Sequence, residues 1–71
     1  MNIQHLVKMA NQIGQFFESE PDQEQAVKDI ASHLKRFWDP RMRKAIIDYA
    51  VKGGDGLKPL VLQAVNHQLN L

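Results

Sequence analysis

The sequence has no cysteine and no long apolar run. Without thiols the chain forms no disulfide, and it offers no thiolate ligand for a metal or an iron–sulfur cluster. No apolar stretch approaches the roughly 18 residues of a membrane span. The sequence also lacks an excess of one charge, since it has 9 basic and 8 acidic residues. This near-neutral balance gives no general reason to expect nucleic acid or membrane binding.

The 71 residues fit one small helical domain spanning residues 1–71. A domain of this size buries about 60% of the surface of its extended chain, so its core is thin. Small domains without disulfides or metals often depend on a partner subunit for stability. The first 14 residues interleave polar and apolar side chains, so no signal-peptide core is visible, and we expect the protein in the cytoplasm.

Apolar residues recur with the helical period of three and four along the whole chain. The fold class we predict is all-α, a small bundle of about four helices with short connections. Proline, aspartate and glycine separate the apolar stripes. The expected helices lie near residues 3–18, 22–37, 40–52 and 58–69.

Three sites in the sequence carry more specific expectations. Asp39 is placed to cap the third helix, with Pro40 at its first position. Gly53 and Gly54 favour a left-handed C-cap at the end of that helix. Gly14 weakens the first helix by about 1 kcal/mol relative to alanine, so we expect a backbone or a bulky ring to approach it closely.

The apolar stripes also predict the core. Its expected members are Ile13, Phe17, Val27, Ile30, Leu34, Ile46, Tyr49, Leu60 and Val61.

No pattern in the sequence indicates catalysis. Five of the eight acidic residues fall between positions 18 and 29, which is typical of a solvated loop and helix start. The three histidines, His5, His33 and His67, lack the spacing of metal ligands. We therefore expect no catalytic, cofactor-binding or metal-binding residue in this chain.

Basic charge gathers at residues 35–44, where five of the nine basic residues surround Phe37, Trp38 and Met42. This segment is compatible with a solvated basic corner, with a protein–protein contact, or with a helix-turn-helix that binds nucleic acid. Phe37 and Trp38 cannot both point into one thin core. Either Trp38 is buried in the corner, or one of the two rings is exposed together with Phe16 and is covered by a partner.

The run Phe37-Trp38-Asp39-Pro40-Arg41-Met42-Arg43 resembles the delta subunit of NAD-dependent formate dehydrogenases that contain molybdenum or tungsten. The stretches 5–13, 16–22 and 56–61 are similar to the same family, so the resemblance covers nearly the whole chain.

The resemblance implies a cytoplasmic complex that oxidises formate to carbon dioxide and reduces NAD. In such complexes an alpha subunit carries the molybdenum or tungsten pterin and iron–sulfur clusters, while beta and gamma subunits carry FMN and further clusters. The delta subunit is a cofactor-free, non-catalytic accessory subunit for assembly or stability. We expect the alpha subunit as its direct partner, and neither nucleic acid nor a membrane. The alternative is a small helical nucleic-acid-binding regulator that uses the basic corner 35–44.

The residues that we expect to bind the partner lie at or near this corner. They are Phe16, Arg36, Trp38, Asp39, Pro40, Arg41 and Arg43. Because Arg41 and Arg43 are two positions apart on a helix, their side chains diverge by about 200°. We therefore expect one of them to brace the corner by pairing with Asp39 or Asp29, and the other to reach the catalytic subunit.

Overall fold

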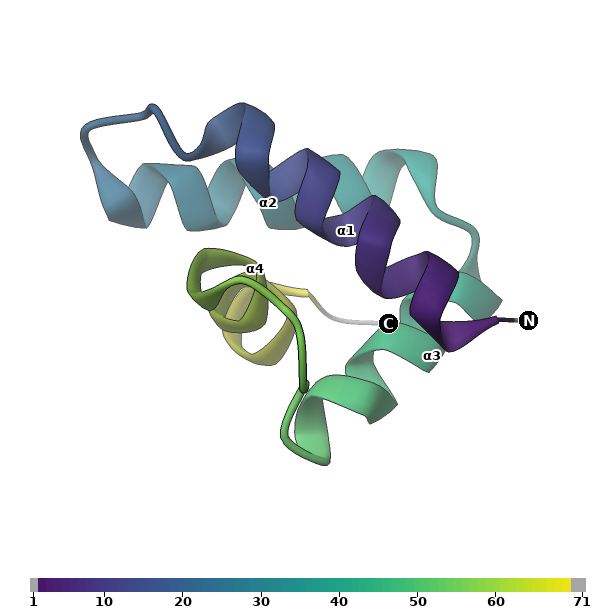
Figure 1. Ribbon diagram of the computed structural model, residues 1–71. Helices are drawn as coiled ribbons and strands as arrows, with labels where there is room; N and C mark the ends of the chain where they lie inside the picture. The colour runs from purple at the N-terminus through teal and green to yellow at the C-terminus, as the bar shows by residue number, and fades with distance from the viewer. Residues whose placement is uncertain (1, 70–71) are drawn as a thin grey trace.

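The computed structural model describes residues 2–69, and these residues form helices and turns with no strand. The all-α prediction is confirmed. The helices are α1 (Ile3–Phe17), α2 (Gln23–Phe37), α3 (Pro40–Val51) and α4 (Pro59–Gln63), and α4 continues into a π-helical turn, η1 (Ala64–Gln68) (Figure 1). None of the helices within residues 2–69 has the length and apolar character needed to cross a membrane.

Three short polar side chains begin the first three helices. The carboxylate or amide oxygen of Asn2, Asp22 and Asp39 accepts a backbone N–H from the first turn of α1, α2 and α3, respectively. At α3 the bond runs from the Met42 N–H to Asp39 Oδ1 at 3.0 Å, and Pro40 takes the first helical position. The predicted cap at Asp39 is confirmed. Such a cap stabilises a helix by about 1 kcal/mol.

The end of α3 is a two-bond glycine cap. The N–H of Gly53 donates to the Ala50 carbonyl and the N–H of Gly54 donates to the Tyr49 carbonyl, both at 3.0 Å. The two glycines have backbone φ angles of +121° and +62°, values that residues with a Cβ atom rarely adopt. The pattern is the Schellman motif, so the C-cap predicted from the glycine pair is confirmed.

The molecule has two layers. Helices α1 and α2 lie side by side and antiparallel, and α4 with η1 packs across both, while α3 contacts α1 and η1 (Figure 1). The core fills the space between these layers, and among the side chains that the structure describes, none that is polar or charged is buried. Its members are Leu6, Val7, Ala10, Val27, Ile30, Ala31, Leu34, Trp38, Ile46, Ala50, Leu57, Val61, Ala64, Val65 and Leu69.

Five of the nine predicted core residues are buried: Val27, Ile30, Leu34, Ile46 and Val61. The other four, Ile13, Phe17, Tyr49 and Leu60, are half-buried at the edge of the core. Ile13 and Phe17 lie on the flank of α1 away from α4, and the Tyr49 hydroxyl reaches out to the Asp55 carbonyl. These four residues pack against the core but are not among its buried members, because an apolar stripe does not reveal how far a neighbouring helix covers it.

Close approach at Gly14 is also observed. A Cβ atom at this buried position would clash with Cγ2 of Val61, whose side chain is itself fully buried. The glycine therefore lets α4 settle against α1. The neighbour is an aliphatic side chain, not the backbone or ring that the sequence suggested.

Candidate partner-binding surface

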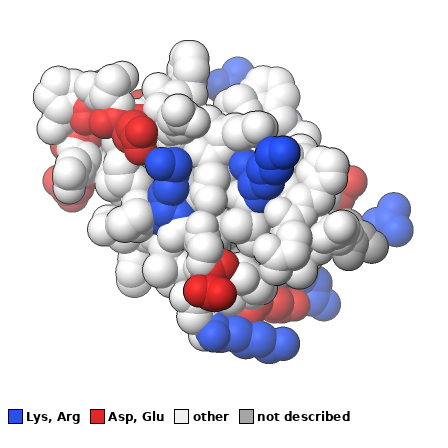
Figure 2. Space-filling model, in the orientation of Figure 1, with Lys and Arg blue, Asp and Glu red and all other residues white. Residues whose placement is uncertain are grey.

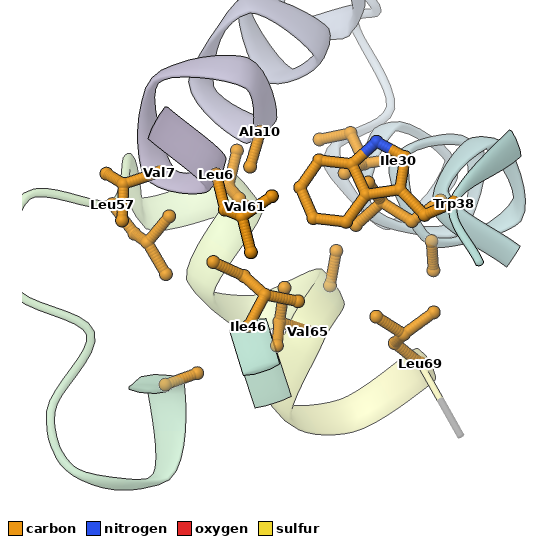
Figure 3. Close-up of a cluster of buried hydrophobic side chains, with 14 of the residues drawn as sticks. Leu6, Val7, Ala10, Ile30, Trp38, Ile46, Leu57, Val61, Val65 and Leu69 are labelled. Carbon is orange, nitrogen blue, oxygen red and sulfur yellow. The ribbon is translucent and has the colours of Figure 1, made fainter. Parts of the chain in front are cut away.

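The corner between α2 and α3 turns at Trp38 and Asp39. Trp38 has an extended backbone with φ −91° and ψ 136°, and its N–H still donates to the Leu34 carbonyl. Its side chain is only 5% exposed. Figure 3 shows the indole ring beside Ile30 of α2 and turned toward the side chains of α1. Trp38 is therefore a core residue, and its expected contact with a partner stays a prediction.

The Phe37 side chain, unlike that of Trp38, stays outside the core and is 67% exposed. The backbone leaves the helix between these two residues, so one ring enters the core while the other stays outside. Of the two interpretations of this ring pair, burial of Trp38 is confirmed, and Phe37 is the ring that is exposed together with Phe16.

Arg43 braces the corner from inside. Its Nη1 donates to the Lys35 carbonyl at 2.8 Å and lies 3.3 Å from the Trp38 carbonyl. The last carbonyls of a helix lack partners within that helix and attract a cation, which explains why Arg43 bonds there. The expected pairing with Asp39 or Asp29 is therefore replaced by a bond to the end of α2.

Arg41 faces solvent on α3. Among residues 2–69, one ion pair is closer than 4.0 Å, with Lys58 Nζ 3.5 Å from Glu18 Oε2. Arg41 therefore has no carboxylate partner in this part of the chain. The divergence expected between Arg41 and Arg43 is thus observed. Asp39 and Pro40 are exposed as well, although the Asp39 carboxylate is engaged in the helix cap.

Beside the corner, four aromatic side chains form a continuous row across α1 and α2, which we call the ring row: Phe16, Phe17, His33 and Phe37. The ring centroids are 5.0 Å apart for Phe16 and Phe17, 6.3 Å for Phe17 and His33, and 4.6 Å for His33 and Phe37. The guanidinium carbon of Arg36 lies 5.7 Å from the centre of the Phe37 ring. Phe16 at one end of the row is 77% exposed.

An open groove of about 420 Å³ runs along the ring row between α1 and α2. We call it the outer groove, and its lining residues are Met9, Gln12, Ile13, Phe16, Phe17, His33 and Trp38. Sequence patterns pointed to Phe16 and Trp38 but missed the other contributions, especially Met9 and His33. The available signal was that Met9 and Phe16 fall outside the main apolar stripe of the first helix.

The acidic residues gather elsewhere. Figure 2 shows acidic side chains over the end of the molecule where α1 connects to α2. No group of three or more histidine, aspartate or glutamate side chains in the described part of the chain is arranged to hold a metal ion. His5, His33 and His67 belong to α1, α2 and η1, respectively.

A family model described as "NADH-dependant formate dehydrogenase delta subunit FdsD" matches residues 5–65 of the chain. The match includes all of the α2–α3 corner and the whole outer groove. Neither the curated proteins nor the solved structures give a significant match.

Proposed function

This chain belongs to the family of NADH-dependent formate dehydrogenase delta subunits, and from that membership we propose that it is a non-catalytic accessory subunit. It binds the catalytic subunit of a cytoplasmic complex that oxidises formate to carbon dioxide and reduces NAD, and it stabilises or assembles that subunit. The observation that carries the proposal is the family match over residues 5–65.

The redox groups belong, in this proposal, to the other subunits of the complex. The molybdenum or tungsten pterin and iron–sulfur clusters are assigned to the alpha subunit, and FMN with further clusters to the beta and gamma subunits. Two properties of the chain support this assignment. The sequence contains no cysteine to ligate a cluster, and the described core is built from apolar side chains.

Contact with the catalytic subunit involves the exposed side of the α2–α3 corner. Of the two arginines that α3 places at this corner, Arg41 has no carboxylate within 4.0 Å among residues 2–69, whereas Arg43 donates to the Lys35 carbonyl at the end of α2. An arginine at the centre of an interface commonly contributes more than about 2 kcal/mol to binding. An exposed arginine without a partner contributes little to folding.

The test uses the full chain and a preparation of the formate dehydrogenase that lacks it. Wild type and the variants Arg41→Ala, Arg43→Ala and Lys52→Ala are compared for retention on the complex and for melting temperature. Lys52 is an exposed cation at the far end of α3 and serves as the matched control. We expect Arg41→Ala to lose retention with unchanged melting, Arg43→Ala to melt earlier, and Lys52→Ala to behave as wild type.

Two results would contradict the proposal. A wild-type chain that does not bind the complex rejects the accessory role itself. Wild-type retention of Arg41→Ala rejects the corner as the contact. Binding of the chain to nucleic acid with a steep salt dependence would support the alternative of a regulator that uses residues 35–44.

A further inference from the structure

We infer that the outer groove is the docking site for an apolar segment of the catalytic subunit, and that this segment carries an acidic residue beside the groove. The inference rests on the proposed function, because it specifies the chemistry of the segment that the partner inserts. It adds to the contact at the charged corner a second one, on the adjoining aromatic face of α1 and α2.

The lining of the groove selects an apolar occupant. Met9, Ile13 and Phe16 contribute one wall from α1, and the edge of the Trp38 indole contributes to the α2 side. The volume of about 420 Å³ is enough for several aliphatic or aromatic side chains. Aromatic residues are enriched in the buried centres of interfaces, so a groove lined by such rings favours a protein partner.

The exposure of the two outermost rings supports the same conclusion. Phe16 is 77% exposed and Phe37 is 67% exposed, although the chain has only three phenylalanines. No part of the described chain covers this side of α1 and α2, because α3, α4 and η1 all pack on the other side (Figure 1). Burial of such rings by a partner removes a large apolar area from water.

Charge complementarity indicates the acidic residue. Arg36 is exposed, and its guanidinium group lies over the Phe37 ring at the edge of the ring row. Asp29 lines the same side of α2, but its carboxylate accepts a hydrogen bond from the Gln25 amide at 2.8 Å. No carboxylate of residues 2–69 is within 4.0 Å of the Arg36 guanidinium. A carboxylate on the incoming segment supplies a counter-charge for Arg36 and can form a bidentate salt bridge with its guanidinium group.

The first experiment compares two exposed rings of the ring row with an exposed apolar residue on another helix. Phe16→Ser and Phe37→Ser remove rings of the ring row, while Val51→Ser removes an equally exposed apolar residue, 76% exposed, on α3. The affinity of each full-length variant for the delta-free complex is measured by titration. We expect a loss of roughly thirtyfold or more for each phenylalanine variant and no change for Val51→Ser.

A charge reversal tests the acidic residue. Arg36→Glu places a negative charge beside the incoming carboxylate, so we expect it to weaken binding more than Arg36→Ala. Lys52→Glu, at the far end of α3, makes the same change of charge away from the groove and should leave the affinity unchanged. Equal losses for Arg36→Glu and Lys52→Glu would mean that only net charge matters, which contradicts the acidic residue in the segment.

Photo-crosslinking identifies the occupant. A photoreactive phenylalanine analogue at position 16 is expected to link to an apolar peptide of the catalytic subunit that contains Asp or Glu, and the same analogue at position 51 is expected not to. A link from position 16 to a second copy of this chain would overturn the inference in favour of self-association. If wild type binds and both phenylalanine variants bind equally well, the groove is rejected as the docking site while the proposed function stands. If wild type itself does not bind, the proposed function is rejected.

Discussion

The two apolar sides of α1 differ in the size of their residues and in what covers them. The side that faces α4 carries Leu6, Val7, Ala10 and Gly14, all of them buried. The side that faces the outer groove carries Met9, Ile13 and Phe16, which are half-buried or exposed. The two smallest residues of these sets, Ala10 and Gly14, lie on the closed side, and the phenyl ring of Phe16 lies on the open side. Close packing inside the chain accounts for the first set. In the second set, Met9 and Ile13 pack only partly against the core, and Phe16 is left 77% exposed.

The largest effect is expected from removing volume in the closed core. Leu34 is fully buried, so Leu34→Ala leaves a cavity and should lower the free energy of unfolding by about 2–5 kcal/mol. Chemical denaturation followed by circular dichroism measures the loss. A variant as stable as wild type would mean that this side of α2 is not packed as described.

Adding volume on the closed side of α1 is expected to cost less. Gly14→Ala introduces a methyl group against Val61, and overpacking of this kind costs about 1–3 kcal/mol. The exposed neighbour Gln15→Ala is the matched control and should be neutral or slightly stabilising. In the double variant Gly14→Ala/Val61→Ala the clash is removed, so the combined loss should be smaller than the sum of the two single losses.

A polar link on the same side of α1 gives the next prediction. The Asn11 amide donates to the Gly56 carbonyl at 2.9 Å and accepts the Lys58 N–H at 2.9 Å, which ties α1 to the segment before α4. Asn11→Ala should lower stability by about 1 kcal/mol. Gln12→Ala, one position along on the groove side, should leave the melting temperature unchanged. Equal melting of both variants would contradict the importance of this link.

The smallest effect on folding is expected on the open side. Phe16→Ala should change the free energy of unfolding of the isolated chain by no more than about 0.5 kcal/mol, because the ring is 77% exposed. A thermal melt of the isolated chain measures this. A loss comparable to that of Leu34→Ala would show that the ring row supports the fold, and the contrast between the two sides of α1 would disappear.

Helix positions were predictable because they depend on short-range chemistry. The Asp39-Pro40 pair and the Gly53-Gly54 pair determine backbone geometry within a few residues, and both behave as the sequence indicates. The fourth helix was less predictable, since the predicted span 58–69 divides into a short α-helix and a π-helical turn. In that turn the Leu69 N–H donates to the Ala64 carbonyl, a spacing that apolar periodicity does not specify.

The side of a helix that becomes covered was not predictable from periodicity. Ile13 and Phe17 fit the apolar stripe as well as Val27 does, yet they lie on the flank of α1 away from α4 and stay half-buried. The acceptors of Arg43 were also missed, because backbone carbonyls at a helix end leave no mark in the sequence. For the candidate site, the motif pointed to the α2–α3 corner, whose role in binding stays a prediction. The aromatic groove beside it depends on how two helices pack.

The bonds of Asn11 also imply an order of events during synthesis of the chain. Asn11 and Lys58 are separated by 47 positions, so α1 is made long before the segment that it binds. Until α4 emerges, the closed side of α1 lacks the Val61 side chain that fills the space at Gly14. Completion of the last turns supplies that neighbour, while α2 and α3, which also contact α1, are made earlier.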